Sequence, residues 1–288
     1  MPRRHRLVLL ALLALVGLSA CSSGPRIDTS HVSQNHDSRV QFLVLHYTVL
    51  DFEQSLRVLT TGGRVSSHYL VRDDPPTIYR LVDEDRRSWH AGASSWGTSA
   101  NLNAASIGIE IVNPGWRDTP AGRVYAPFPP AQIDAVIALV KDIVARHRIR
   151  PDRIVGHNEI APGRKQDPGP MFPWKRLADE GLIPWPDEAQ VAARRAELAA
   201  GPLPPIEWFQ TRLARVGYLI APTGVLDTTT RNVLSTFQMK YRPSDIAGNA
   251  DLDTAALLDV ATRPGGMKLR GQAAATSARP SAGDDGAP

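Results

Sequence analysis

A short irregular loop, residues 156–168, carries the side chains of this chain that are best suited to chemistry. Its sequence places His157, Lys165 and Asp167 close together among glycines and prolines. Such a loop buries little apolar surface, so packing does not explain it well. A neutral histidine and an ionised aspartate are good ligands for a borderline ion such as zinc. A third ligand is available in His46, which ends the apolar run that starts at Leu43.

These three candidate ligands include no thiolate, because the chain has one cysteine, Cys21, near its N-terminus. His46 and His157 both follow apolar runs typical of buried strands, so they can face one another across neighbouring strands. Three protein ligands leave a fourth tetrahedral position for water, which is the pattern of a catalytic zinc site. Taken singly, each histidine is more often a hydrogen-bonded structural residue.

Glu110 and Lys165 are candidate catalytic residues beside such a metal. Glu110 interrupts the apolar run 107–112, where a carboxylate is costly to bury unless it is paired or near a cation. There it would act as a general base toward water. Lys165 stands two positions before Asp167 and would stabilise the oxyanion formed when water attacks an amide carbonyl. The alternatives are a Glu110 that points to solvent and a solvated Lys165.

Strands and helices that alternate between residues 39 and 186 predict an α/β domain with a mixed central β-sheet flanked by helices. We expect its strands at residues 40–48, 68–72, 77–82 and 107–112. A short helix should follow Asp51, which can cap it. The clearest helix spans residues 130–147, because its apolar residues recur at helical spacing and a proline stands at its start.

Residues 1–21 are typical of a bacterial lipoprotein signal peptide. A basic start precedes an apolar run too short for a membrane span, which needs roughly 20 residues. Residues 18–21, Leu-Ser-Ala-Cys, resemble the lipobox, in which the cysteine (here Cys21) is lipidated. Ser22 follows, where an aspartate would indicate inner-membrane retention. We therefore expect lipid anchoring at the periplasmic face of the outer membrane, with residues 22–37 as a tether. The alternatives are an uncleaved anchor or an ordinary signal peptide.

The charge composition argues against a nucleic-acid partner. The formal net charge is +4, and Arg3, Arg4 and Arg6 of the signal peptide supply three of these charges. The remaining +1 is too weak for the electrostatic footprint that nucleic acid requires.

Residues 40–175 resemble the type 2 family of N-acetylmuramoyl-L-alanine amidases, which are zinc enzymes related to peptidoglycan recognition proteins. Five motifs in the same order carry the resemblance, at residues 43–48, 65–71, 88–92, 103–110 and 156–170. The signal peptide and a C-terminal module make the chain most similar to the lipid-anchored amidase D branch.

The resemblance implies that His46, His157 and Asp167 bind zinc, that Glu110 is the base and that Lys165 stabilises the oxyanion. Some relatives use cysteine as the third ligand, and non-catalytic recognition proteins lose that ligand. The chain keeps a ligand there, which favours an enzyme over a pure binding module.

Five further residues are weaker candidates for contacts with the substrate: Tyr47, His68, Trp89, His90 and Asn113. Trp89 and His90 precede Ala91-Gly92 on a predicted loop suited to contacting a sugar or a peptide. The alternative is a packed aromatic side chain beside a hydrogen-bonded imidazole.

The catalytic domain is expected at residues 38–186, followed by a helical and proline-rich linker at 187–205. Residues 206–263 resemble a peptidoglycan-binding domain of the three-helix type, and they could instead pack onto the amidase domain in a purely structural role. Residues 264–288 are rich in Gly, Ala, Ser and Pro and are predicted to be disordered.

The sequence therefore predicts a monomeric, zinc-dependent amidase that takes part in cell-wall turnover. Its expected reaction is hydrolysis of the amide between N-acetylmuramic acid, also in its 1,6-anhydro form, and L-Ala of peptidoglycan stem peptides. The alternatives are a non-catalytic muropeptide receptor and a zinc peptidase that cuts within the stem peptide.

Overall fold

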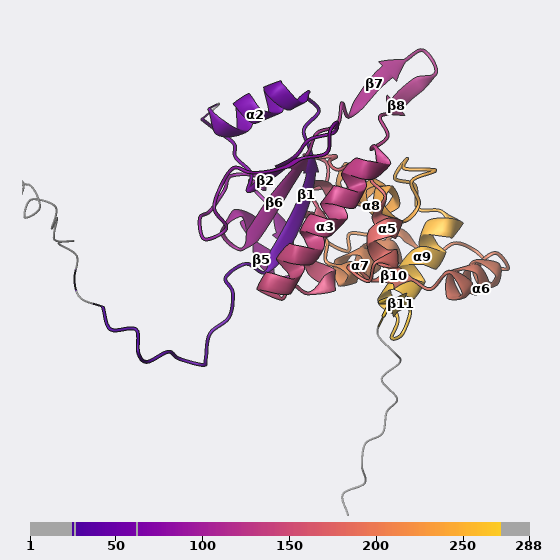
Figure 1. Cartoon of the computed structure of the whole chain (residues 1–288). Helices are drawn as coiled ribbons and strands as arrows, with labels where there is room; N and C mark the ends of the chain where they lie inside the picture. The colour runs from indigo at the N-terminus through magenta and orange to yellow at the C-terminus, as the bar shows by residue number, and fades with distance from the viewer. Residues whose placement is uncertain (1–24, 26, 62, 272–288) are drawn as a thin grey trace, which may run out of the picture. The chain divides into compact units, whose positions relative to one another are not determined.

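The computed structural model of the chain describes residue 25 and residues 27–61 and 63–271 (Figure 1). The predicted signal peptide and Cys21 lie outside the described residues. Contacts divide the chain into two units, Met1–Asp37 and Ser38–Pro288, and every element below belongs to the second. Within the described part of the chain, no helix combines the length and hydropathy needed to cross a membrane.

A five-stranded mixed sheet with the order β3-β2-β6-β1-β9 forms the centre of the second unit. β1 pairs in parallel with β6 and β9, β2 pairs in parallel with β6, and β3 is antiparallel to β2. The strands are β1 (Phe42–Tyr47), β2 (Tyr69–Val71), β3 (Ile78–Arg80), β6 (Ser106–Ile111) and β9 (Ile154–Gly156). The expected mixed sheet is confirmed.

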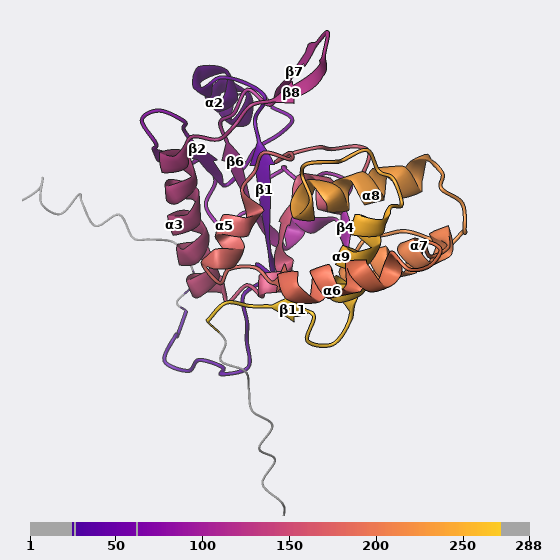
Figure 2. The ribbon, with the colours of Figure 1, turned by 90° about the vertical axis from the view of Figure 1, so that its right-hand side faces the viewer.

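Helices cover both faces of this sheet (Figure 2). Among the described residues the helices are α2 (Phe52–Thr60), α3 (Pro130–His147), α4 (His157–Ile160), α5 (Trp174–Asp179), α6 (Glu188–Leu198), α7 (Ile206–Val216), α8 (Thr228–Tyr241) and α9 (Leu252–Thr262). The helix predicted at residues 130–147 is confirmed as α3. The predicted cap of α2 is also confirmed, because the Asp51 carboxylate accepts a hydrogen bond from the Gln54 N–H at 2.8 Å.

The two faces of the sheet bury different sets of side chains, because successive side chains of a strand point to opposite sides. Leu43 and Leu45 of β1 pack against α3 and α5. Phe42 and Val44 pack instead with the core of the C-terminal helices α7, α8 and α9. His46 follows the same alternation and therefore lies on the face that the C-terminal helices share.

Shorter elements complete the unit. They are the two-stranded pairs β4 (Ser95–Trp96) with β5 (Ser99–Ala100) and β7 (Trp116–Thr119) with β8 (Gly122–Tyr125), and the 3₁₀ turns η1 (Leu102–Ala104) and η2 (Pro151–Arg153). The β7–β8 hairpin projects beyond the central sheet in Figure 1. This hairpin was not predicted from the sequence, because its polar residues give no apolar alternation.

The C-terminal domain continues beyond its predicted end. β11 (Met267–Lys268) pairs with β10 (Trp185–Pro186), where the amidase-like domain ends, and the Asp187 N–H donates to the Gly266 carbonyl at 2.9 Å. The prediction that residues 264–288 are disordered is therefore wrong for residues 264–271. The backbone pairing that orders them depends on a distant segment, which local composition cannot show.

Helix α6, inside the predicted linker, packs along α9 of the C-terminal domain. The buried carboxylate of Asp259 on α9 pairs with Arg194 of α6 at 2.7 Å and with Arg212 of α7 at 2.7 Å, and it also pairs with Arg263. A buried charge requires such partners. The helical part of residues 187–205 is thus an integral part of this domain.

Glu84 joins the sheet to the C-terminal end of α3. Its carboxylate contacts the Tyr69 hydroxyl at 2.7 Å, the His147 ring at 2.8 Å and the Arg146 guanidinium. Burial alone would raise the pKa of Glu84, but the hydrogen bonds from Arg146, His147 and Tyr69 outweigh burial and lower the pKa to about 2.

We predict that Glu84→Gln removes a pH-dependent part of the stability. Because folding lowers the pKa of Glu84 from 4.5, this stabilisation is fully present above that value and is lost as the pH falls toward the folded pKa. At about pH 7 the variant should lose about 1–2 kcal/mol, since Arg146 is partly exposed and screened. Urea unfolding should show the difference shrinking between about pH 5 and about pH 3. A difference that stays constant over this range contradicts the assignment.

Candidate active site

Three buried side chains meet at the end of β1. The Oδ2 atom of Asp167 lies 2.9 Å from the Nδ1 atom of His46 and 3.0 Å from the Nδ1 atom of His157, and the two Nδ1 atoms are 3.0 Å apart. Each residue thus offers one ligand atom within 4.8 Å of the others. The structure brings together the three residues that the sequence singled out, and this trio could hold a metal ion.

Strand pairing explains why His46 and His157 meet. β1 and β9 are parallel, with Leu45 opposite Gly156, so the next residue of each strand is one of the histidines. The loop then returns Asp167 to the same place, because the Asn158 N–H donates to the Asp167 carbonyl at 2.8 Å. The ends of two paired strands and one backbone hydrogen bond within the loop therefore position all three side chains.

Hydrogen bonds fix which ring nitrogen of His157 is free. The Ala91 carbonyl can only accept, and it lies 3.0 Å from the Nε2 atom of His157. Nε2 therefore carries the proton, which leaves a lone pair on the Nδ1 atom that faces Asp167.

A chain of hydrogen bonds fixes His46 in the same way. The Ser106 hydroxyl donates to the Leu102 carbonyl at 2.6 Å, so its oxygen accepts from the Nε2 atom of His90 at 3.1 Å. The Nδ1 atom of His90 then accepts from the Nε2 atom of His46 at 2.9 Å. The lone pair of His46 is thereby directed from Nδ1 toward Asp167 and His157, as a metal ligand requires.

Burial and neighbouring charges set the protonation states of the trio. Burial, followed by the neighbouring imidazole of His157, lowers the pKa of His46 to about 4, although Asp167 opposes this change. Burial would raise the pKa of Asp167, but the interactions with His157 and His46 outweigh burial and hold this pKa below its ordinary value. At neutral pH the site therefore offers a neutral imidazole and a carboxylate, which are the forms that bind metals.

Glu110 stands beside this trio on the neighbouring strand. In the parallel pairing of β1 with β6, Glu110 lies opposite His46, on the same face of the sheet. Its Oε2 atom is buried and has no hydrogen-bond partner among the described residues. Burial, reinforced by the Asp167 charge and opposed by Lys165, raises the pKa of Glu110 well above its ordinary value. A carboxyl group whose charged form is disfavoured in this way holds a proton more strongly, which suits a group that takes a proton from water.

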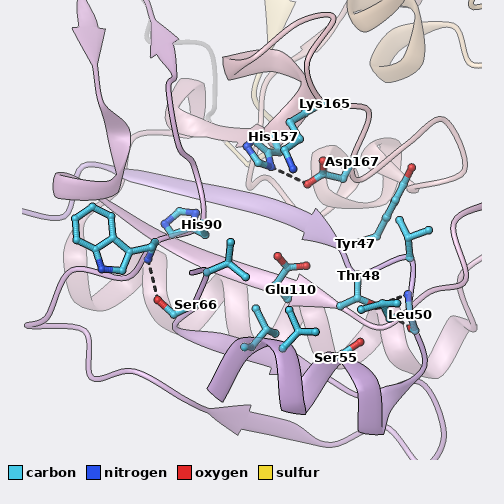
Figure 3. A pocket seen from close by; sticks show the side chains of 15 residues that line it. Tyr47, Thr48, Leu50, Ser55, Ser66, His90, Glu110, His157, Lys165 and Asp167 are labelled. Carbon is cyan, nitrogen blue, oxygen red and sulfur yellow. Dashed lines mark hydrogen bonds and ion pairs between the residues drawn. The ribbon is translucent and has the colours of Figure 1, made fainter. Parts of the chain in front are cut away.

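A cavity of about 240 Å³ brings these groups together. Figure 3 shows Glu110 on one side, with His157, Lys165 and Asp167 on the other. Lys165 is exposed, so its ammonium is accessible to a molecule in the cavity. The residues predicted for catalysis thus share one open space.

Three of the predicted substrate contacts also line this cavity: Tyr47, Trp89 and His90. Trp89 is 52% exposed and stacks under the Arg87 guanidinium at 4.2 Å, which leaves a ring face at the rim. His90 is buried, and both of its ring nitrogens bind protein partners. Its polar atoms therefore support His46 and are not free for a substrate.

The other two predicted contacts, His68 and Asn113, do not line the cavity. His68 is fully buried and accepts a hydrogen bond from the Gly108 N–H at 3.1 Å. Asn113 donates to the Pro127 carbonyl at 3.1 Å and accepts from the Gly115 N–H at 2.7 Å. Both side chains are engaged by backbone groups outside the cavity, so the expectation of substrate contact is wrong for them. Their sequence motifs gave no sign of this burial.

The supporting residues Ser106 and Gly108 were not predicted from the sequence. They alternate with isoleucines along β6, on the face that carries Glu110. A β-carbon at Gly108 would lie 2.5 Å from the Cγ atom of His90, so the glycine makes room for the imidazole. The alternation of small or polar residues with isoleucine was the signal in the sequence that could have identified these two residues.

Comparisons with known proteins assign this arrangement to a family. A family model described as N-acetylmuramoyl-L-alanine amidase matches residues 36–170, and a peptidoglycan binding domain model matches residues 203–258. The chain is 43% identical to the N-acetylmuramoyl-L-alanine amidase AmiD of Escherichia coli K12 over 244 residues, which cover 82% of this chain and 87% of AmiD. The chain belongs to the N-acetylmuramoyl-L-alanine amidase family. It is an enzyme that hydrolyses the amide between N-acetylmuramic acid and L-alanine.

Two solved structures share the fold over 82% of this chain. The Escherichia coli AmiD complex with anhydro-N-acetylmuramic acid-L-Ala-D-gamma-Glu-L-Lys has a TM-score of 0.74 and 43% identity, covering 82% of this chain and 93% of AmiD. AmpDh3 of Pseudomonas aeruginosa, in complex with anhydromuramic pentapeptide, has a TM-score of 0.74 and 38% identity, covering 82% and 96%. The fold expected from the family resemblance is confirmed.

Another amidase matches a smaller share of the chain. The 1,6-anhydro-N-acetylmuramyl-L-alanine amidase AmpD of Enterobacter cloacae is 36% identical over 113 residues, which cover 39% of this chain and 55% of AmpD.

We predict that Gly108→Ala disturbs the amidase site through His90. The new methyl group would overlap the His90 ring, displace it and break its bond to His46. We expect a stability loss of about 1–3 kcal/mol and a fall in activity of at least about tenfold, the scale found for partners of metal ligands. Thermal melts and turnover of a muropeptide measure the two effects.

Gly201→Ala is the matched control, because a β-carbon there meets no atom within 4 Å. Full activity and an unchanged melting temperature in Gly108→Ala would show that the His90 ring does not depend on this glycine.

Proposed function

We propose that this amidase is a zinc enzyme and that His46, His157 and Asp167 hold the metal. The observation that carries the proposal is the convergence of two unprotonated Nδ1 atoms and one carboxylate oxygen within 4.8 Å beside an open cavity. Two imidazoles and a carboxylate form a donor set that suits zinc, and three protein donors leave one position for a further ligand. When bound, zinc supplies Lewis acidity, which lowers the pKa of water and polarises a carbonyl.

Glu110 is proposed as the group that moves the proton. Its raised pKa and its unpaired, buried Oε2 atom allow it to take a proton from the attacking water and to hold it. The amide nitrogen can leave only when it is protonated, and Glu110 is then the acid that returns the proton. One carboxyl group can serve both proton transfers, because burial in the cavity raises its pKa.

Lys165 is proposed to bind the carbonyl oxygen of the scissile amide. As the amide carbon becomes tetrahedral, this oxygen gains negative charge, which an ammonium group stabilises. Lys165 lines the cavity on the side of the candidate ligands, while Glu110 lies across from it (Figure 3). The base and the cation thus approach the amide from different sides.

The proposed substrates are muropeptides, and those with the 1,6-anhydro sugar are included among them. Support comes from the relatives AmiD and AmpDh3, whose solved complexes contain anhydromuramyl peptides. The exposed ring of Trp89 at the rim of the cavity offers a face for stacking against a sugar.

The experiment that tests this function feeds defined anhydromuropeptides to the purified protein and measures the products by mass spectrometry. We expect free stem peptide that begins with L-alanine, loss of this product after treatment with a chelator, and recovery with zinc. Binding without products would support a muropeptide receptor instead, and new amino termini within the stem would support a peptidase.

Glu110→Gln serves as the mechanistic variant in the same assay. It keeps the shape of the side chain but cannot accept the proton, so we expect about 100-fold to 10,000-fold slower turnover with zinc still bound. Glu180→Gln is the control, because Glu180 lies on the surface and pairs with Lys141 at 2.7 Å. Turnover of Glu110→Gln at the wild-type rate would remove the assigned role.

We also propose that Cys21 carries lipid and anchors the enzyme at the periplasmic face of the outer membrane. The lipobox-like residues 18–21 and Ser22 support this proposal. Cys21→Ser should move the protein from the membrane fraction to the soluble fraction, and Ser22→Asp should move it to the inner membrane, with muropeptide turnover unchanged in both. Cell fractionation followed by immunoblotting checks this, and a Cys21→Ser protein that stays with the membrane would contradict it.

A further inference from the structure

The helix that begins with the candidate ligand His157 is bound by the C-terminal domain. Glu159, two residues after this ligand on α4, is 2% exposed. Both of its carboxylate oxygens lie 3.0 Å from the Nζ atom of Lys240, which is 7% exposed and lies on α8 of the C-terminal domain. A buried ion pair therefore joins the two domains next to the site.

The same carboxylate also holds the backbone from which His157 projects. The Oε2 atom of Glu159 accepts the Gly156 N–H at 2.8 Å. Gly156 ends β9, and His157 is the next residue. Lys240 and the Gly156 N–H thus share the Glu159 carboxylate. The orientation of His157 therefore depends on where Lys240 holds this carboxylate.

Lys240 itself is fixed on the amidase side. Its ammonium group lies 4.3 Å from the centre of the Trp174 ring, on α5 of the amidase domain. Trp174 is almost completely buried and would meet a β-carbon placed at Gly156 at 3.2 Å. The cation therefore occupies a closed site formed by the amidase domain.

Other residues of α8 lie against the same loop. The Asn158 side chain donates to the Sδ atom of Met239 at 3.5 Å. A β-carbon at Gly163 would lie 2.3 Å from the Nδ2 atom of Asn232, so the loop passes directly over α8. The loop between the two candidate ligands thus uses the C-terminal domain as its support.

Stability alone is a weak reason for this ion pair, because buried pairs can often be replaced by apolar residues with little loss. Their best-attested benefit is to specify one arrangement of the groups around them. Here the arrangement that is specified contains a candidate metal ligand.

We propose that Lys240 is a positioning residue of the active site, and that the C-terminal domain holds the metal-binding loop in addition to any contact with peptidoglycan. The proposal rests on the proposed function, since it concerns zinc binding by His157. Lys240 acts through Glu159, which fixes Gly156 and α4. Groups that orient metal ligands change metal affinity by about 10-fold to 100-fold when they are removed.

The test measures zinc affinity of the full chain by competition with a chromophoric chelator, together with muropeptide turnover. We expect Lys240→Met to weaken zinc binding by about 10-fold to 100-fold while circular dichroism shows a folded protein. Lys240→Gln, which keeps a donor for Glu159, should weaken it by about tenfold and serves if the first variant does not fold. The double variant with Glu159→Gln leaves no buried charge unpaired, so it should stay folded. Its zinc affinity should still be below that of the wild type, because α8 no longer holds the loop through Lys240.

Arg242→Met is the matched control. Arg242 lies two residues from Lys240 and pairs with Asp251 at 2.6 Å inside the C-terminal domain. Its zinc affinity should equal that of the wild type. Unchanged affinity in a folded Lys240 variant, or an equal loss in Arg242→Met, would overturn the proposal. Wild-type protein that binds no zinc would instead refute the proposed function.

Discussion

The parallel pairing of β1 with both of its neighbours is the constraint on which the active site depends. It places Glu110 opposite His46 and Gly156 opposite Leu45, so Glu110 and both histidines gather where these strands end. A shift of one residue in either pairing would turn a side chain to the opposite face, under α3. The apolar alternation of β1 prevents this shift, because Leu43 and Leu45 must face the α3 side while Phe42 and Val44 face the C-terminal helices. The packing of the core thus determines which side chains face the active site.

Burial then gives the gathered groups different protonation states. It lowers the pKa of His46 and raises that of Glu110, so burial disfavours the charged form of both groups. Asp167 remains ionised because two imidazoles bind it, and its negative charge adds to the effect of burial on Glu110. The two carboxyl groups therefore differ, because the charged form is favoured at Asp167 and disfavoured at Glu110. This difference comes from position in the fold, since the two side chains have nearly the same chemistry in water.

Much of this site could be predicted from the sequence, because its residues lie in short contiguous motifs. The loop 156–168 and the run ending in His46 carry ligand types at strand ends, and Glu110 is conspicuous in an apolar strand. The supporting groups were harder to find. His90 looked like a substrate contact, yet its nitrogens serve His46 and Ser106, and this depends on a glycine 18 residues later in the chain, Gly108. The order of residues 264–271 likewise depends on pairing with a distant strand.

The β10–β11 pair has a consequence for how the enzyme meets the cell wall. The chain enters the C-terminal domain through α6, which packs on α9, and leaves it through β11, which returns to the end of the amidase domain. A domain held at its entrance and its exit cannot swing on a linker. Any glycan strand that it binds therefore reaches the catalytic cavity at one set offset along its length. Since stem peptides recur regularly along peptidoglycan, such an offset would make the enzyme select cleavage positions by their spacing from the bound sugars.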